Sequence, residues 1–397
     1  MPRLSFRTAG ESHGPTLISL VEGLPAGVVV DDQLVDGELR RRQGGYGRGG
    51  RQKIETDTAD YLTGVRRAAD GIRRTIGSPV TIAVKNKDNR LDDPEKTPPL
   101  TRPRPGHADL AGSIKWLTTD CRETLERASA RETAARVAAG ALAKCLLQQF
   151  DIHVLGFVRQ VGEARGHFDV TADNWRDMQA ARDGNDLYCP DESAAAEMRE
   201  FIRQQKMAKD TAGGVVECHV FGCPVGLGSS MSIDGRLDGR IGQAVMSIQA
   251  FKGVEIGLGF GVAERPGSKV HDEIAFDPDH ADTPTLGFTR ATNNAGGLEG
   301  GMTNGQPVVV RGVMKPISTL GKPLRSVDLD TKQPSAAGWE RSDISAISAA
   351  SVVMENVIAF AIADALCEKL GGDSVTEMKL HHDAYLTAAR DLGLQEK

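Results

Sequence analysis

The sequence predicts an α+β fold in which antiparallel sheets pack on a central layer of long helices. Two long apolar stretches, residues 130–150 and 344–370, have the length and composition of buried helices. Shorter apolar runs around them show the moderate alternation of strands. These runs are residues 17–25, 80–86, 153–161, 213–222, 254–263 and 306–316. Regularly spaced βαβ units are absent from the pattern, which argues against a doubly wound parallel sheet.

Two short segments of similar sequence precede the long helices. Arg127-Ala-Ser129 lies at the start of the first helix, and Arg341-Ser-Asp343 lies at the start of the second. Both helices are rich in alanine and other small residues, so neighbouring elements can approach them closely. The similarity of the two segments and of the helices that follow them indicates an internal duplication of the fold around its helical layer.

Each long helix also has predicted ends. Ser129 and Glu132 form the Ser-x-x-Glu pattern of a capping box, so we expect the first helix to begin at Ser129. Asp343 or Ser345 can cap the second helix, and the glycine pair at residues 371–372 stops it.

The whole chain has the composition of one folded unit, and we expect a single domain over residues 1–397. It has 48 Lys and Arg against 54 Asp and Glu, a net charge of 48 − 54 = −6, whereas nucleic-acid and membrane-surface proteins are usually basic. The sequence shows neither a secretory signal nor an apolar run as long as a membrane span. Its six cysteines form no C-x-x-C pair, so we expect a reduced, cytoplasmic protein without a metal centre.

An arginine- and glycine-rich stretch, residues 40–53, carries the strongest signal for binding. This stretch contains six Lys or Arg residues and no acid, and the first acid after it is Glu55, in a chain that is acidic overall. Guanidinium groups bind phosphate and carboxylate oxygens, and glycines let the backbone approach an anion. A solvated basic loop and an RNA contact remain alternatives. The G-x-G-x-x-G string in this stretch follows a predicted helix instead of a strand, so a dinucleotide-binding fold is not indicated.

Two histidines lie in glycine-flanked turns near arginine. His13 is part of Gly-Glu-Ser-His-Gly at residues 10–14, and His107 is part of Arg-Pro-Gly-His-Ala-Asp at residues 104–109. Histidines in such turns are candidates for acid–base chemistry. The other seven histidines lack these surroundings, and we interpret them as surface or core residues.

Two later segments are candidate cradles for a phosphate-bearing cofactor. Residues 293–305 are rich in glycine and asparagine, and Lys315-Pro-Ile-Ser-Thr319 follows the next predicted strand. Arg341 and Asp343 add a cation and a carboxylate at the start of a helix, whose dipole favours anions. These residues indicate a polyanion-binding active site with acid–base histidines, without naming the reaction.

Seven motifs, taken in order, resemble the chorismate synthase family from Thr8 to about Leu370. They are GESHGPTLISLVEGLPAG, RRRQGGYGRGGRQKIE, PRPGHADLAG, ERASARETAARVAAGAL, NNAGGLEGGMTNGQP, MKPISTL and RSDISAISAASVVMENV. Ile344 departs from the residues that other members often carry after Arg-Ser-Asp, and residues 262–289 match no motif.

The resemblance implies a shikimate-pathway lyase that converts 5-enolpyruvylshikimate 3-phosphate into chorismate and phosphate by 1,4-elimination. It implies reduced FMN as a cofactor without net redox change, NAD(P)H as an optional reductant, and a homotetramer. By similarity, His13 would assist the departing phosphate, and His107 would protonate or hydrogen-bond the reduced flavin. Asp343 would act near the flavin N5 atom.

The resemblance also implies two sets of ligands. The substrate ligands would be Arg42, Arg48, Arg51 and Arg131. The flavin ligands would be Arg127, Ala128, Ser129, Gln249, Ala250, Gly300, Lys315, Pro316, Ile317, Ser318, Thr319 and Arg341.

Two other functions remain open from the sequence. One is an RNA-binding protein that uses the arginine- and glycine-rich stretch, which steep salt dependence of oligonucleotide binding would support. The other is a flavin reductase that oxidises NAD(P)H itself, since no motif separates it from the lyase. For the lyase we expect a small-molecule substrate, and neither nucleic acid nor a membrane as a partner.

Overall fold

The first of two antiparallel sheets is formed mainly by the N-terminal part of the chain. The computed structural model describes residues 4–50, 54–338, 340 and 342–392, so the predicted ligands Arg51 and Arg341 lie outside the described residues. The strands of this sheet, in spatial order, are β1 (Ser5–Ala9), β2 (Thr16–Glu22), β6 (Val80–Lys85) and β3 (Asp60–Thr63).

The second antiparallel sheet is formed by the middle of the chain. Its strands, in spatial order, are β10 (Phe251–Ile256), β15 (Val308–Met314), β9 (Gly214–Phe221), β7 (His153–Val161) and β8 (Ala164–Arg165).

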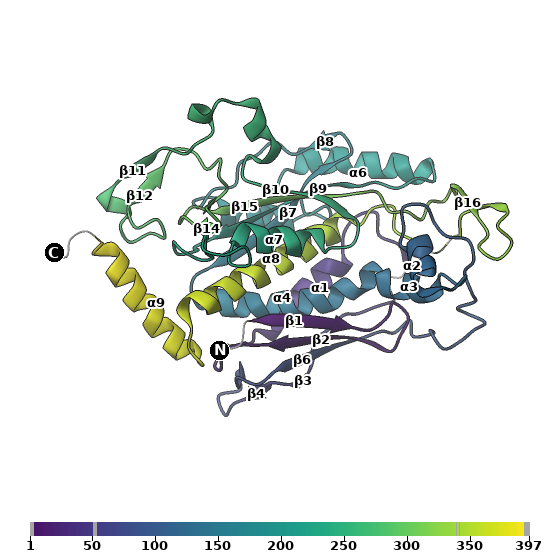
Figure 1. Ribbon diagram of the computed structural model, residues 1–397, viewed down its shortest axis with the longest axis horizontal. Helices are drawn as coiled ribbons and strands as arrows, with labels where there is room; N and C mark the ends of the chain where they lie inside the picture. Colours follow the sequence, from purple (N-terminus) through teal and green to yellow (C-terminus); the bar gives the residue numbers. More distant parts are fainter. Residues whose placement is uncertain (1–3, 51–53, 339, 341, 393–397) are drawn as a thin grey trace.

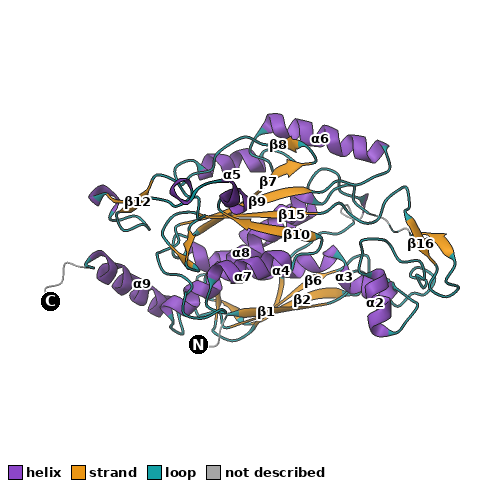
Figure 2. Ribbon diagram, turned by 45° about the horizontal axis from the view of Figure 1, so that its top comes forward, coloured by secondary structure: helices purple, strands orange, loops and turns teal. Residues whose placement is uncertain are grey.

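Three helices lie between the two sheets. They are α1 (Asp32–Gln43), α4 (Thr133–Gln148) and α8 (Ile347–Leu370). In Figures 1 and 2, α4 lies against β1, β2 and β6, whereas α8 contacts β7, β9 and β15. The predicted α+β fold, with a helical layer between antiparallel sheets, is confirmed. One long helix covers each sheet, as an internal duplication would arrange them.

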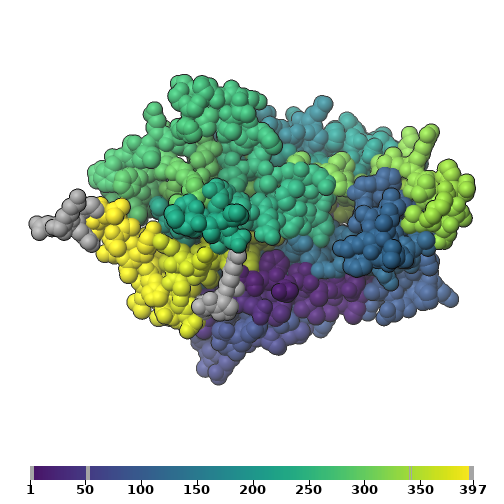
Figure 3. Space-filling model, in the orientation of Figure 1, coloured from purple at the N-terminus to yellow at the C-terminus, as the bar shows by residue number. Residues whose placement is uncertain are grey.

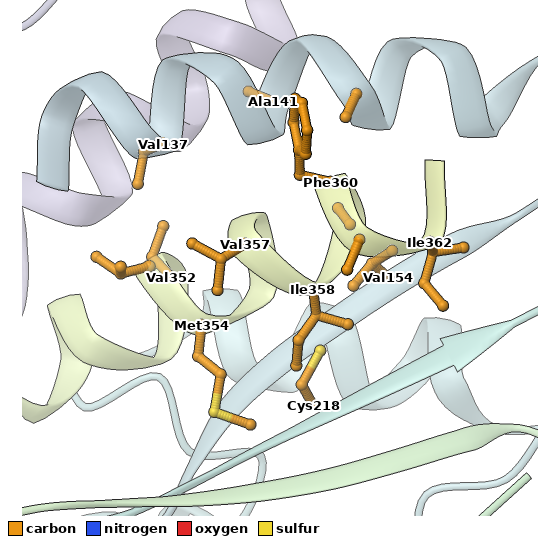
Figure 4. Close-up of a cluster of buried hydrophobic side chains, with 14 of the residues drawn as sticks. Val137, Ala141, Val154, Cys218, Val352, Met354, Val357, Ile358, Phe360 and Ile362 are labelled. Carbon is orange, nitrogen blue, oxygen red and sulfur yellow. The ribbon is translucent and has the colours of Figure 1, made fainter. Parts of the chain in front are cut away.

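The contact between α4 and α8 depends on small residues. A Cβ atom added at Gly140 of α4 would lie 2.3 Å from the backbone oxygen of Asn356 on α8, so a larger residue would push the helices apart. On the side of the second sheet, Met354 and Ile358 of α8 point toward β9, where Cys218 lies beneath them (Figure 4). The hydrophobic core therefore runs from sheet to sheet through the helical layer.

α8 is apolar on every side, and its mean hydropathy of 1.7 over 18 residues would suffice to cross a membrane. All of those residues are buried inside the protein, so the position of α8 between two sheets explains its composition. This run was not expected to span a membrane, because polar residues interrupt it. Two of them have buried partners: Glu355 accepts from Lys144 at 2.6 Å, and Asn356 donates to Glu38 at 2.7 Å.

The start of the first long helix differs from the prediction. Ser129 caps a short 3-10 turn, η2 (Ala130–Glu132), and α4 follows that turn directly. The expected capping box is incomplete, because the Glu132 carboxylate bonds to Arg136 at 2.8 Å and to Gln249 at 2.9 Å instead of reaching back to Ser129.

The start of the second long helix also differs in part. Asp343 does not cap α8, because its carboxylate accepts a hydrogen bond from the backbone N–H of Gly49 at 2.6 Å. Ser345 is not the cap either, because the N-cap residue is Ala346, which makes no side-chain cap hydrogen bond. The Ser345 hydroxyl, one residue earlier, accepts from the N–H of Ile347 at 3.4 Å. The predicted end is confirmed, with Gly371 at φ +61° immediately after the last helical residue.

Each predicted strand run contains a strand, but one run is too long. The chain turns at Gly257 and Gly259, both with positive φ, and then forms a 3-10 helix, η3 (Gly259–Glu264), where strand was predicted up to residue 263. β1 and β3 were not predicted, because these two strands lie at the sheet edges and hardly any of their side chains are buried.

The other elements are α7, which packs on α8 and on β10, and the elements that surround this three-layer core. Their bounds are β4 (Val65–Arg67), β5 (Arg73–Thr75), α2 (Asp109–Trp116), α3 (Arg122–Ala128), α5 (Trp175–Asp183), α6 (Glu192–Met207), α7 (Leu237–Met246), η4 (Gly267–Lys269), β11 (Ile274–Phe276), η5 (Pro278–His280), β12 (Phe288–Arg290), β13 (Leu298–Glu299), β14 (Met302–Thr303), β16 (Arg325–Val327), β17 (Pro334–Ala336) and α9 (Val375–Arg390). Figure 3 shows α2 and α3 beside the β16–β17 hairpin at one end of the molecule. Residues 262–289, which match no motif, form an arm with β11 and β12 at the opposite end, near α9.

Candidate active site

His13 lies in the turn between β1 and β2, and α3 holds its ring. The Glu126 carboxylate lies 2.8 Å from Nδ1 of His13 and also accepts the His13 backbone N–H at 2.9 Å. Burial raises the pKa of Glu126, but the hydrogen bonds and charge of His13 outweigh this, and the pKa stays below its ordinary value. On the other ring nitrogen, Nε2, a guanidinium nitrogen of Arg90 approaches to 3.2 Å. The two ring nitrogens thus have separate partners.

Asn86 joins the His13 turn to a buried arginine. Its amide nitrogen donates to the backbone oxygen of Gly14 at 2.7 Å, and its amide oxygen accepts from Nε of Arg131 at 2.8 Å. Because Asn86 directly follows β6, the first sheet sets the distance between the histidine and the arginine. His13 and Arg131, predicted from separate motifs, therefore belong to one site.

Three predicted substrate ligands form what we call the arginine cluster: Arg42, Arg48 and Arg131. Arg42 and Arg131 both donate at 2.7 Å to the same oxygen of Asp57, which is fully buried. Burial lowers the pKa of Arg42, Asp57 raises it, and the positive charges of Arg131 and Arg48 lower it further, to about 10. Arg42 therefore shares its one close carboxylate with Arg131, and a bound anion would add negative charge beside the two arginines.

Arg48 connects this cluster to the segment before α8. Its guanidinium lies 3.0 Å from the Asp343 carboxylate, whose other oxygen accepts the Gly49 N–H. A Cβ added at Gly45 would lie 2.5 Å from the Cβ of Ser348, and Gly47 has a φ of +85°. Close packing on the start of α8 thus explains Gly45 and Gly47, whereas a Cβ added at Gly50 would meet nothing within 4 Å. The approach of this loop to an anion stays a prediction.

His107 lies just before α2 and makes a short contact between its Nδ1 and the Asp109 carboxylate. Arg104 donates to the same carboxylate at 2.8 Å, lies 3.0 Å from Nδ1 of His107, and donates to Thr319 at 2.9 Å. Burial raises the pKa of Asp109, but the hydrogen bonds from His107 and Arg104 hold it well below its ordinary value. The His107 turn is thereby fixed to one of the predicted flavin segments.

The segment Lys315–Thr319 lies between the His107 turn and the second sheet. Lys315 donates through Nζ to the backbone oxygen of Gly106 at 2.6 Å and through its backbone N–H to Ala250 at 3.0 Å. Thr211 donates to the oxygen of Ile317 at 2.7 Å, and the next residue, Ala212, bonds to Ile344. The segment therefore lies between His107 and the start of α8, with Pro316 and Ser318 along the same stretch.

The predicted flavin ligands before α4, Arg127 to Ser129, contact β1 and the His13 turn. Gln249 donates to Glu132 at 2.9 Å, and Arg127 donates to the backbone oxygen of Thr8 at 3.0 Å. The Ser129 hydroxyl lies 3.1 Å from that of Ser12, with Ala128 between Ser129 and Arg127 in the chain. Since Ala250 follows Gln249, these contacts run from the His13 turn to Lys315.

Gly300 is not brought into this set of contacts. It lies in the turn between β13 and β14 with a φ of +60°, and its nearest neighbours in the described chain are Met302 and Ser230. A Cβ at this position would come no closer than 3.7 Å to either residue. An added Cβ would therefore make only ordinary van der Waals contacts, so the positive φ is the feature that favours glycine here.

Several residues of the site were missed from the sequence. They are Asp57, Asn86, Arg90, Arg104 and Glu126. The only sequence signal available was adjacency, since Arg104 lies in the His107 motif and Glu126 begins the motif that contains Arg127. Their partners are far apart in sequence, 113 residues in the case of His13 and Glu126. Among the residues that the structure describes, no group of three His, Cys, Asp or Glu side chains could hold a metal ion.

The predicted flavin residues present groups that fit a flavin nucleotide. Burial and the nearby positive charge of Lys252 lower the pKa of Lys315, so a phosphate bound beside Lys315 would be stabilised. The side-chain oxygen of Gln249 is buried and has no hydrogen-bond partner in the described part of the chain, which suits an N–H edge of a flavin ring.

Comparisons with known proteins agree with this geometry. The sequence profile of the chorismate synthase family matches residues 4–367. The chorismate synthase of Geobacter metallireducens is 51% identical over 402 residues, covering 98% of this chain and 99% of that protein. That of Thermoanaerobacter pseudethanolicus is 47% identical over 388 residues, covering 98% and 100%. A crystal structure of chorismate synthase has a TM-score of 0.78 and 38% identity, covering 98% of this chain and 99% of that one. The chain therefore belongs to the chorismate synthase family.

Proposed function

We propose that this lyase converts 5-enolpyruvylshikimate 3-phosphate into chorismate and phosphate in a site that holds reduced FMN. The observation that carries the proposal is the arginine cluster, in which Arg42 and Arg131 share one Asp57 oxygen and Asn86 ties Arg131 to the His13 turn. A substrate with a phosphate and two carboxylates would add negative charge beside these arginines.

The substrate ligands in this proposal are Arg42, Arg48 and Arg131, together with Arg51. Arg42 and Arg131 are buried, with exposed fractions of 3% and 7%, so contacts to them would form away from water and gain strength. This burial favours a small anion over RNA, which needs arginines on an open surface. Asp343 would orient Arg48 and, near the flavin N5, would help return a proton.

His13 acts in this proposal as the acid that assists the departing phosphate. The allylic C–O bond of the substrate breaks, the bonding electrons leave with the phosphate, and a proton from the histidine reduces the charge that develops on its oxygen. His107 would protonate or hydrogen-bond the flavin. Reduced FMN, when bound, supplies the electron density that weakens the allylic bond and accepts the C6 hydrogen.

The flavin would be held by the residues that link the two histidine turns. Gln249 and Ala250 face Lys315 to Thr319 through the Ala250–Lys315 hydrogen bond. Arg127, Ala128 and Ser129 would complete the set, together with Arg341 and with Gly300 in the turn between β13 and β14. We further propose a cytoplasmic homotetramer, with NAD(P)H as an optional reductant of the flavin.

Anaerobic single-turnover spectroscopy tests the reaction. With reduced FMN, phosphate should appear with chorismate, and the flavin spectrum should return to that of the reduced form. Oxidised FMN should allow substrate binding without turnover, because the arginines do not depend on redox state. Full turnover with oxidised FMN and no reductant would overturn the proposed role of the flavin.

Single substitutions of the histidines test the assignment of roles. His13→Ala and His107→Ala should each lower kcat by roughly 10- to 10⁴-fold, the range for loss of an acid–base group. His381→Ala and His382→Ala are matched controls on α9, at the opposite end of the molecule, and should keep wild-type activity. Equal losses in all four variants would mean that folding, and not chemistry, is affected.

A further inference from the structure

We propose that Glu126 is the positioning residue of His13, an inference that rests on the proposed role of His13 in the reaction. Glu126 lies on α3, and its side chain is almost fully buried, with 2% of the residue exposed. A carboxylate at such a position needs partners in the protein. The His13 turn provides them.

Glu126 holds the turn at three points. Its carboxylate lies 2.8 and 3.0 Å from Nδ1 of His13 and accepts the His13 backbone N–H at 2.9 Å. Its backbone oxygen accepts the N–H of Ser12 at 3.0 Å. Both the ring and the main chain of the turn are therefore fixed to one residue of α3.

This contact decides which ring nitrogen can exchange a proton. A carboxylate accepts hydrogen bonds and cannot donate them, so Nδ1 carries a hydrogen toward Glu126. Proton transfer is then left to Nε2. Arg90 can donate to Nε2 at 3.2 Å when that nitrogen is unprotonated, and the Asp88 carboxylate, 3.7 Å away, can form an ion pair with the ring when Nε2 is protonated.

Arg122, one turn before Glu126 on α3, is a further charged group beside the Glu126 carboxylate. It lies 3.8 Å from the Glu126 carboxylate and 3.0 Å from the carboxylate of Glu340. It also donates to the backbone oxygen of Pro98 at 3.0 Å. Because Arg122 is farther from the Glu126 carboxylate than His13 is, the stronger hydrogen bonds of Glu126 go to His13.

Steady-state kinetics of the holoenzyme test the proposal with three variants. Glu126→Ala should lower kcat by roughly 10- to 10⁴-fold, like loss of the acid itself, while KM stays within about 3-fold of wild type because Glu126 lies behind the histidine. Glu126→Gln, which can still accept from Nδ1, should retain more activity than Glu126→Ala. The control is Glu123→Gln, an exposed residue of the same helix, which should leave both constants unchanged.

A double-mutant cycle separates positioning from general support of the fold. If Glu126 acts only through His13, adding Glu126→Gln to His13→Ala should cause no further loss of kcat. A purely structural role would make the two losses multiply, and that result would overturn the proposal. An equal and large rise in KM in both Glu126 variants would also overturn it.

The same data distinguish failure of the inference from failure of the proposed function. If His13→Ala keeps wild-type kcat, the role of His13 is wrong, and the positioning proposal falls with it. If His13→Ala loses activity while Glu126→Ala does not, only the positioning proposal is wrong. Thermal unfolding of each variant shows whether the compared proteins are folded to the same extent.

Discussion

Two neighbouring arginines of α1, Arg41 and Arg42, belong to different clusters of charged residues, and their pKa values shift in opposite directions. Arg41 donates to Glu38 at 2.7 Å and to Glu355 at 3.0 Å. Burial lowers the pKa of Arg41, but these two carboxylates outweigh burial and hold it above its ordinary value. This balanced cluster has three bases, Arg41, Lys144 and Arg182, and three acids, Glu38, Asp183 and Glu355.

Arg42, one residue later, has the opposite shift. Its pKa falls to about 10, because burial and the charges of Arg131 and Arg48 outweigh the single carboxylate of Asp57. The balanced cluster finds its counter-ions within the protein, so it joins α1 to α4 and α8. In the arginine cluster, Arg42 and Arg131 share the single carboxylate of Asp57, and we propose that an anion from outside the protein adds to it. The charges that surround each arginine therefore distinguish Arg41 from Arg42, for which we propose a role in substrate binding.

The largest expected effect comes from breaking the balanced cluster. Glu355→Ala leaves Arg41, Lys144 and Arg182 without their shared carboxylate, and loss of one partner from a buried ion pair costs about 3–5 kcal/mol. We expect urea unfolding to show a drop of that size in the free energy of unfolding, while KM of the folded fraction stays unchanged.

The control for this variant is Glu368→Ala on the same helix. Glu368 is 54% exposed and pairs with Arg240 at 2.5 Å, so its loss should cost less than about 1 kcal/mol. If Glu355→Ala were no more destabilising than Glu368→Ala, the balanced cluster would have no structural role.

The second prediction concerns the arginine cluster. If the proposed substrate contacts exist, Arg42→Ala and Arg48→Ala should each remove a charge-assisted contact worth about 1.5–3 kcal/mol, or roughly 10- to 150-fold in affinity. Substrate titration by flavin absorbance measures this loss. Arg40→Ala is the matched control, because Arg40 belongs to the same sequence run but is exposed. Equal affinity in all three variants would mean that the cluster does not bind the substrate.

Much of the fold could be predicted from the sequence because its determinants are local. The apolar runs of α4 and α8 and the glycine pair after Leu370 depend on neighbouring residues, and all three predictions hold in the structure. The capping box at Ser129 was wrong because the Glu132 carboxylate has other partners, Arg136 one turn away and Gln249 far along the chain.

The candidate site was predictable in its residues but not in their partners. His13 and Arg131 could be identified from motifs, whereas Glu126 and Asn86 could not, since nothing local requires them. The run Arg40-Arg41-Arg42 is a single cation cluster in the sequence. Its division between two clusters depends on Glu355, which is 314 residues from Arg41, and only the folded chain brings these two residues together.

A third, smaller effect should distinguish the two clusters without the substrate. Inorganic phosphate at about ten times its dissociation constant should stabilise the wild-type protein by roughly 1–2 kcal/mol, since it binds the folded form. Thermal unfolding with and without phosphate measures this. Arg131→Ala should lose most of the stabilisation, whereas Lys144→Met, in the balanced cluster, should keep it although its stability without phosphate is lower. Equal stabilisation of both variants would place phosphate binding elsewhere.

The smallest expected effect is the acid sensitivity of the balanced cluster. Burial raises the pKa of Glu38, but Arg41, Lys144 and Arg182 hold it well below its ordinary value of 4.5. A carboxyl group with a lowered pKa in the folded state contributes stability above its unfolded pKa, and that contribution is lost as the pH falls. Lowering the pH from 7 to 4 should therefore remove roughly 1 kcal/mol through Glu38. Urea unfolding at both pH values should show a smaller loss in Glu38→Gln than in the wild type. An identical loss would show that Glu38 keeps its ordinary pKa in the folded protein, so that the three cations do not act on it as the balanced cluster requires.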